Sequence, residues 1–223
     1  MTASEVTVRL HSDLFEVVVG TIAARGCATQ VASTHLDDLI PETVRRIAEA
    51  PPSSETKAAV RDMLRHGRYK PTGRGKPASE YLVRSATQGT FPRINNLVDA
   101  LNVVSLDSGL PISILDVQRA GASAFVIRRG RPGERYVFNQ GGQEIGLEDL
   151  LLVAAEPEDR PCANPVKDSM ATKLVEGTTD VLAVVYGPAA LAERVREATA
   201  RLESLMVQVA SPQTVSSTVL SAV

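Results

Sequence analysis

Hydrophobic and polar residues alternate along the chain in patterns that predict strands near both ends and helices between them. Valine-rich runs such as Phe15–Ala24 are typical of strands. Apolar residues that recur every three or four positions from Ile94, with a stop at Gly109, are typical of a helix. Strands are expected at 6–10, 15–24, 124–128, 135–139, 150–155 and 181–186, and helices at 39–50, 55–66, 94–108 and 188–209. We expect 124–128 and 135–139 to pair as a hairpin, and we expect an α+β fold of mixed β-sheets packed with helices.

The chain length and its C-terminal composition suggest how it divides. The 223 residues are enough for one well-buried domain, and no internal repeat is present. We therefore expect a single domain over residues 1–210. Residues 211–223 are rich in Ser, Thr and Val, and we expect them to be a flexible tail, either disordered or paired with the sheet edge of a partner.

Composition excludes several classes of protein. A hydrophobic fraction of 43% excludes disordered and collagen-like chains, and a net charge of -2 argues against a nucleic-acid coat, so no DNA partner is expected. Cys27 and Cys162 lie far apart with no CxxC pattern, which argues against a disulfide framework or a thiolate metal site. Since neither a membrane-length apolar run nor an apolar leader is found, we expect no membrane segment and a cytoplasmic protein.

The charge is nevertheless uneven. Seven basic and two acidic residues lie between Arg61 and Arg84, and a second basic stretch runs from Arg128 to Arg135. Pro and Gly residues place much of the first stretch on a loop at 68–77. Basic side chains interleaved with aromatic ones suit a single-stranded nucleic-acid end, whereas a solvated face explains the charge alone equally well.

Familiar phosphate and metal motifs are incomplete. Gly75-Lys76 resembles the end of a P-loop, but Pro77 stands where Ser or Thr is required. The three histidines lie in separate expected elements. We therefore expect no metal site, no cofactor and no nucleophile activated by histidine.

Two groups of polar residues lie where helix and core patterns would not place them. Asn95, Asp99 and Asn102 follow one stripe of an expected helix, although solvent-facing positions usually hold Lys, Glu or Arg. Asn164-Pro165 is a typical helix start, with Asn as the cap. Capping does not account for the polar residues that follow, which are Lys167, Asp168, Ser169, Thr172 and Lys173.

These residues belong to a longer string that resembles the tRNA-editing domain of the phenylalanyl-tRNA synthetase β subunit. The resemblance spans residues 67–186 and is carried by Asn95–Leu106, Gly109–Ser113, Asp116, Asn164–Lys173 and Thr178–Asp180. It implies an α+β fold and hydrolysis of the ester that joins a wrong amino acid to the 3′ end of a tRNA. Without a synthetase core in this sequence, the resemblance is to the free-standing branch, which implies a trans-editing aminoacyl-tRNA deacylase of translation quality control that binds tRNA and needs no cofactor.

The chain departs from the family pattern at three positions. Of the Thr-Asn pair at the tRNA-end site only Asn102 remains, with Leu101 before it, while Ser113 replaces a His and Val184 falls where a Glu reads the tyrosine hydroxyl. The resemblance therefore implies a substrate other than tyrosyl-tRNA, and canavanyl-tRNA(Arg) is the first choice. The alternatives are a non-catalytic tRNA- or RNA-binding module and a small-molecule sensor that retains the pocket.

The resemblance and the residue types together give sets of candidate residues. An aminoacyl ester is already activated, so orienting water and polarising the carbonyl suffice to hydrolyse it. The catalytic candidates are Asn102, Asp168, Ser169 and Thr172. The substrate-binding candidates are Asn95, Asp99, Ser113, Asp116, Lys167 and Val184. The candidates for binding tRNA are Arg68, Tyr69, Lys70, Arg74 and Lys76. A cationic amino-acid side chain would need a carboxylate, which leaves Asp99, Asp116 and Asp168 open as partners. For Asp116, a turn cap after Pro111 is the alternative.

Overall fold

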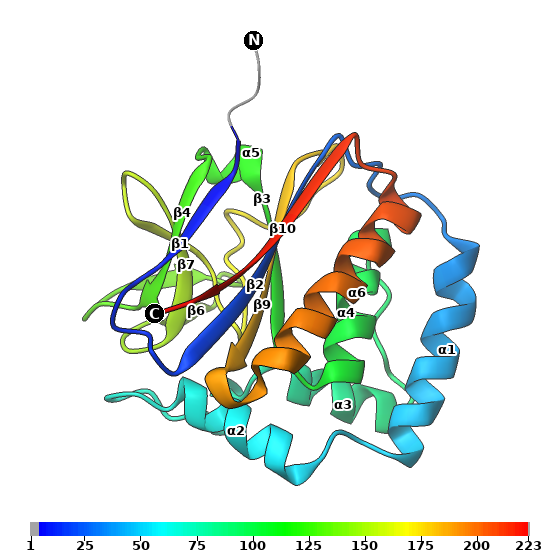
Figure 1. The fold of residues 1–223 in the computed structure, drawn as a ribbon, viewed down its shortest axis with the longest axis horizontal. Coiled ribbons are helices and arrows are strands. Elements are labelled where there is room, and N and C mark those ends of the chain that lie inside the picture. The colour runs from blue at the N-terminus through cyan, green and yellow to red at the C-terminus, as the bar shows by residue number, and fades with distance from the viewer. Residues whose placement is uncertain (1–4, 223) are drawn as a thin grey trace.

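Two four-stranded sheets and a layer of helices make up the described chain (Figure 1). This computed structural model describes residues 5–222, so residues 1–4 of the expected domain and residue 223 of the expected tail lie outside it. The α+β class predicted from the sequence is confirmed.

The first sheet has the strand order β1-β4-β7-β8. Its strands are β1 (Thr7–Leu10), β4 (Ala124–Arg129), β7 (Leu151–Ala155) and β8 (Arg160–Ala163). The β1 and β4 strands are parallel, and the other neighbours are antiparallel. A separate two-stranded ribbon pairs β5 (Arg135–Val137) with β6 (Glu144–Gly146).

The second sheet is antiparallel throughout and has the order β10-β2-β9-β3. Its strands are β2 (Val17–Arg25), β3 (Ile112–Asp116), β9 (Val181–Pro188) and β10 (Thr214–Ser221). Every residue of β9 is buried, because this strand lies between two others in the middle of the molecule. Such a strand shows a continuous apolar run rather than alternation.

Helices cover the face of the second sheet that is turned away from the first sheet (Figure 1). The α-helices are α1 (Thr34–Glu49), α2 (Ser54–Leu64), α3 (Ala78–Thr87), α4 (Asn96–Ser108), α5 (Val117–Ala120) and α6 (Ala192–Ala210), and short 3-10 turns lie at η1 (Gly73–Gly75) and η2 (Ala189–Leu191). Within residues 5–222, none of these helices is both long and apolar enough to cross a membrane.

Two glycines allow α6 to lie close to the sheet. A Cβ atom on Gly20 of β2 would overlap the side chain of Thr199, and one on Gly187 of β9 would overlap Val195. Both overlapping side chains belong to buried positions of α6. A larger residue at either glycine would therefore push the helix away from the strands.

The helix α4 forms one wall of the site, and its ends are fixed by local chemistry. The Asn95 side chain accepts a hydrogen bond from the Val98 N–H at 2.9 Å, which caps the first turn. Gly109 ends the helix with a φ of +73°, a left-handed conformation that favours glycine. Most residues between these ends are buried, because α4 packs on α1, α3, α6 and β3.

The hairpin expected from the sequence is absent. The predicted hairpin of 124–128 with 135–139 does not form, because β4 pairs with β1 and β7 while β5 pairs with β6. The ribbon closes instead around a turn in which the Gly142 N–H donates to the Asn139 carbonyl at 3.1 Å, a local contact that needs no long loop.

The expected flexible tail is mostly a strand. The strand β10 pairs with β2 of the same chain, from Thr214 opposite Arg25 to Ser221 opposite Val18. Without this pairing, the backbone groups along that edge of β2 would have no strand partner.

Candidate functional site

Two adjoining cavities share α3 and the segment 164–174 as walls. The first also reaches α4 and β3, and the second reaches α2 and the loop at 68–77. We call the first the aliphatic cavity, of about 500 Å³, because Leu82, Val98, Leu101, Ile112 and Ile114 contribute much of its lining. Its polar lining residues are Asn95, Asn102, Asn164, Lys167, Asp168 and Lys173. The segment 164–174 is held against β3, since the Asp116 N–H donates to the Thr172 carbonyl at 2.8 Å.

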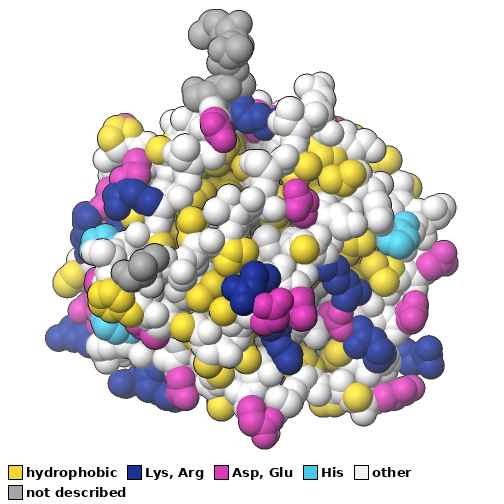
Figure 2. Space-filling model, in the orientation of Figure 1, with side chains coloured by type: hydrophobic (Ala, Val, Ile, Leu, Met, Phe, Trp, Pro, Cys, Tyr) yellow, Lys and Arg dark blue, Asp and Glu magenta, His cyan; other side chains and the backbone are white. Residues whose placement is uncertain are grey.

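The second cavity, which we call the basic cavity, has a volume of about 970 Å³ and shares Tyr81, Lys167, Asp168 and Lys173 with the first. Its basic lining residues are Lys57, Arg74, Lys76, Arg84, Lys167 and Lys173. Only two acidic residues, Glu80 and Asp168, line it, and Arg61 binds the Glu80 carboxylate at 2.5 and 2.6 Å. By contrast, Figure 2 shows basic and acidic side chains interspersed on the face over β10 and α6.

Asp168 lies at the junction of the two cavities, on the segment that follows β8. Burial raises the pKa of its carboxyl group to about 7, although hydrogen bonds from the backbone of Asn164 and Ile114 and the charge of Lys173 oppose this shift. The Asn164 N–H donates to Asp168 Oδ1 at 3.3 Å. A carboxyl group with this pKa changes its protonation state near neutral pH, which suits a general base or acid.

Asn164 shapes this segment rather than starting a helix. Its Oδ1 accepts hydrogen bonds from the N–H groups of Val166 and Lys167, both at 2.8 Å, and its Nδ2 donates to the Tyr136 hydroxyl at 2.5 Å. Tyr136 in turn donates to the Lys167 carbonyl at 2.7 Å. The helix start expected at Asn164-Pro165 is therefore wrong, because the Asn164 side chain closes a turn and no helix follows before β9.

The polar stripe of α4 divides into residues with different surroundings. Asn102 is 8% exposed and lines the aliphatic cavity. The Asp99 carboxylate instead accepts from the Ile94 N–H at 2.7 Å and from Arg93 Nε at 2.9 Å, so both oxygens are engaged. Asn95 lines the cavity, but its side-chain oxygen caps the helix.

Five further candidates hold parts of the framework together, and the catalytic and substrate-binding roles expected for them stay predictions. The Ser169 Oγ accepts from the Ala171 N–H at 3.2 Å, and the Thr172 hydroxyl donates to the Cys162 carbonyl at 2.7 Å. Asp116 caps α5 through the Arg119 N–H and accepts from the Thr178 hydroxyl at 2.6 Å.

The other two framework candidates lie in the second sheet. The Ser113 hydroxyl shares a hydrogen bond of 2.5 Å with the Tyr186 hydroxyl, and Val184 is buried in β9. Across the described residues, none of these five lines either cavity. The four polar residues among them form hydrogen bonds within the protein. Of the described Asp and Glu residues, Asp168 is the one that lines the aliphatic cavity.

The loop predicted at 68–77 contributes unequally to the site. Arg74 and Lys76 line the basic cavity, and within residues 5–222 neither forms an ion pair with another side chain. Tyr69 instead braces the loop, donating its hydroxyl to the Gly75 carbonyl at 2.7 Å, and burial raises its pKa. The Arg68 guanidinium lies 3.5 Å from the Glu148 carboxylate, and Lys70 Nζ donates to the Gly67 carbonyl at 3.3 Å. Neither Arg68 nor Lys70 lines the basic cavity.

Lys167 and Phe138 form a contact that sequence reasoning missed. Lys167 Nζ lies 3.8 Å from the centroid of the Phe138 ring, and both side chains line the basic cavity. Burial and the nearby charge of Arg74 lower the pKa of Lys167. Lys57 on α2 and Tyr81 and Arg84 on α3 were likewise not among the candidates, because no local motif connects them with Asp168.

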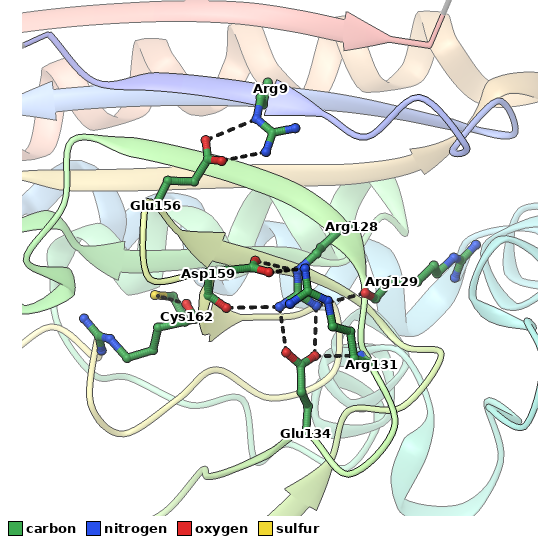
Figure 3. Close-up of polar contacts among 9 residues, drawn as sticks. Arg9, Arg128, Arg129, Arg131, Glu134, Glu156, Asp159 and Cys162 are labelled. Carbon is green, nitrogen blue, oxygen red and sulfur yellow. Dashed lines mark hydrogen bonds and ion pairs between the residues drawn. The ribbon is translucent and has the colours of Figure 1, made fainter.

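The second basic stretch pairs with acidic side chains, and Arg128 is its buried centre (Figure 3). Arg128 is 5% exposed and binds Glu134 through two hydrogen bonds of 2.7 and 2.8 Å. Its Nε donates to Asp159 at 2.7 Å, and Arg131 also pairs with Asp159. The Arg128 contacts hold the end of β4 to neighbouring loops and leave this guanidinium group unavailable to an anionic ligand.

A metal site finds no support in the described chain. Across residues 5–222, no three His, Cys, Asp or Glu side chains come close enough to hold a metal ion. Both cysteines are buried and free.

The fold and the paired cavities define an α+β domain with a ligand-sized pocket beside a basic surface. Residues 70–208 match the family model described as the B3/4 domain, and the chain belongs to that family. The predicted resemblance is thereby confirmed for the family, while the free-standing deacylase branch stays a prediction.

The relatives it resembles are phenylalanine-tRNA ligase β subunits. The chain is 32% identical over 89 residues to the subunit of Symbiobacterium thermophilum, a match that covers 40% of this chain and 10% of the relative. It is 30% identical over 106 residues to the subunit of Anaeromyxobacter dehalogenans, which covers 48% and 13% of the two chains. This chain therefore corresponds to about a tenth of these curated relatives.

A solved structure resembles the fold across nearly the whole chain. It is an N-terminal fragment of the phenylalanyl-tRNA synthetase β subunit from Pyrococcus horikoshii, with a TM-score of 0.50 and 13% identity. The match covers 95% of this chain and 50% of the fragment. At this identity the likeness concerns the fold alone.

Proposed function

We propose that this chain binds the 3′ end of a mischarged aminoacyl-tRNA and hydrolyses the ester bond to the amino acid, acting in trans as a deacylase. The observation that carries the proposal is Asp168, a carboxyl group with a pKa of about 7 between a cavity for an amino-acid side chain and a basic cavity for phosphates. The relatives support it, because they are β subunits of a tRNA ligase.

In the proposed reaction, Asp168 acts as the general base. Its ionised carboxylate accepts a proton from a water molecule, and the water oxygen attacks the ester carbonyl carbon. The Asn102 amide, which lines the same cavity, donates a hydrogen bond to the carbonyl oxygen as negative charge develops there. The bond to the ribose oxygen then breaks, and this oxygen takes up a proton, which releases a free amino acid and an intact tRNA.

Canavanyl-tRNA(Arg) is the substrate we propose first. The aliphatic cavity is lined mainly by uncharged side chains, and Asp168 is the one carboxylate among the described residues that faces it. Arginine keeps its charge in such surroundings and is costly to bury. The oxygen beside the guanidino group of canavanine makes that group less basic, so it can enter uncharged at a lower cost than arginine.

A panel of tRNAs charged with different amino acids tests this function. The purified chain should release the amino acid from at least one mischarged tRNA, with canavanyl-tRNA(Arg) cleaved in preference to arginyl-tRNA(Arg). The rival is a non-catalytic tRNA-binding module, which is favoured by the internal hydrogen bonds of Ser169 and Thr172. Binding of tRNA without loss of any ester would establish the rival instead.

The basic cavity predicts a salt-dependent contact with phosphates. Replacing both Arg74 and Lys76 by alanine should weaken tRNA binding and reduce the slope of log affinity against log salt by about one unit per lost phosphate contact. Filter binding between about 50 and 200 mM salt measures the slope. The matched control is Arg45→Ala with Arg65→Ala, two exposed basic residues that do not line the cavity. If the two double variants reduce the slope of log affinity against log salt equally, the loop is only a solvated face.

A further inference from the structure

Tyr81 is an exposed aromatic side chain at the point where the two cavities meet. It is 55% exposed and lines both the aliphatic and the basic cavity. A single exposed aromatic ring is common on a protein surface, so the feature that distinguishes Tyr81 is its place between the two cavities. Tyr81 has no part in the proposed hydrolysis, so its position calls for a separate explanation.

The helix that presents Tyr81 is firmly anchored. On one face of α3, Leu82 is buried in a cluster with Ile47 and Leu106. At its start, the Ala78 N–H donates to the Pro165 carbonyl at 2.9 Å, which ties α3 to the segment that holds Asp168. The ion pair of Glu80 with Arg61 holds the helix to α2. The backbone that carries Tyr81 is therefore fixed relative to the two cavities.

One cation lies over this ring, and others line the cavity that it faces. Arg84, one turn further along α3, has its guanidinium carbon 5.4 Å from the centre of the Tyr81 ring. Arg74 and Lys76 line the same cavity. An aromatic face next to positive charges is the arrangement that binds single-stranded nucleic acid, with a base stacked on the ring and phosphates beside the cations.

We propose that Tyr81 is a stacking platform for the terminal nucleobase of an RNA 3′ end, and that Arg84 supports the stack. This inference rests on the proposed function, because a base stacked on Tyr81 brings its ribose ester to the mouth of the aliphatic cavity. Tyr81 is a positioning residue, and it takes no part in proton transfer.

The test compares an intact tRNA with the same tRNA lacking only its 3′-terminal base. Tyr81→Ala should weaken binding of the intact, uncharged tRNA about tenfold, whereas Tyr81→Phe should bind as the wild type does. On the tRNA with the abasic end, the wild type and Tyr81→Ala should bind equally. Phe15→Ala is the matched control, since Phe15 is 67% exposed but lines neither cavity.

Each outcome has one meaning. Equal losses for Tyr81→Ala on the intact and abasic ends, or no loss on either, would overturn the stacking proposal while leaving the deacylase proposal in place. Failure of the wild-type chain to cleave any mischarged tRNA would overturn the deacylase proposal, and the binding measurements would still decide whether Tyr81 stacks on the base. Circular dichroism spectra that match the wild type show that the variants are folded.

Discussion

Asp168→Asn should lower the rate of ester hydrolysis by about a hundredfold or more while leaving tRNA affinity nearly unchanged. The amide has almost the same shape as the carboxylate, but it cannot accept a proton from water. The change removes charge at the junction of the cavities without altering Arg74 and Lys76, the residues proposed to bind phosphate. Single-turnover hydrolysis with saturating enzyme measures the chemical step directly.

The control for this variant is Asp62→Asn, which removes an exposed carboxylate that lines neither cavity. Its rate should equal that of the wild type. An Asp168→Asn variant that retains full activity would remove Asp168 from the reaction. A variant that cleaves other mischarged tRNAs normally and loses only canavanyl-tRNA(Arg) would make Asp168 a reader of the amino-acid side chain.

The same substitution should stabilise the folded protein at high pH. The pKa of Asp168 is raised to about 7 in the folded state, above its value of about 3.9 in an unfolded chain. The folded state therefore binds this proton more tightly, and the stability it contributes is lost as pH rises from about 4 to about 7. At about pH 8, Asp168→Asn should raise the free energy of unfolding by about 4 kcal/mol, because each pKa unit corresponds to about 1.4 kcal/mol, and at about pH 4 it should change it little. Urea denaturation of the wild type and of Asp168→Asn at both pH values measures the change in the free energy of unfolding and its sign.

Arg128→Met should destabilise the fold by about 3–5 kcal/mol. Arg128 is 5% exposed, and its removal would leave the partly buried Glu134 and Asp159 carboxylates without this partner (Figure 3). Chemical denaturation measures the loss. Arg131→Met is the control, because its side chain is 63% exposed and its pair with Asp159 should contribute less than about 1 kcal/mol. A stable Arg128→Met protein with weakened tRNA binding would instead make this stretch part of the nucleic-acid surface.

Local sequence signals predicted the elements that depend on local contacts. The helix α4 could be predicted because its apolar spacing, its Asn95 cap and its Gly109 stop all lie within one short segment. The pairing of β10 with β2 could not be predicted, because the two strands lie at opposite ends of the chain and no turn connects them. The false hairpin of 124–139 arose in the same way, since β4 takes both of its partners from distant segments.

The site was predicted only in part, for a related reason. A polar residue in an apolar setting marks either a ligand site or a buried hydrogen-bond network, and the sequence signal is the same for both. Asn102 and Asp168 face a cavity, whereas Asp99 is held by Arg93 and the Ile94 N–H. Whether such a residue faces a cavity or joins a hydrogen-bond network depends on residues from distant parts of the chain that the fold brings next to it. The basic stretch from Arg128 shows the same limit, because its acidic partner Asp159 comes from a separate loop.

The pH dependence of single-turnover hydrolysis tests the central claim most directly. The substrate is the mischarged tRNA that the wild-type chain cleaves best, and the uncatalysed rate at each pH is subtracted. If Asp168 is the general base, the rate should rise with pH to a plateau with a midpoint of about 7, and this step should disappear in Asp168→Asn. A rate that does not change across this midpoint, or an unchanged step in Asp168→Asn, would contradict the account.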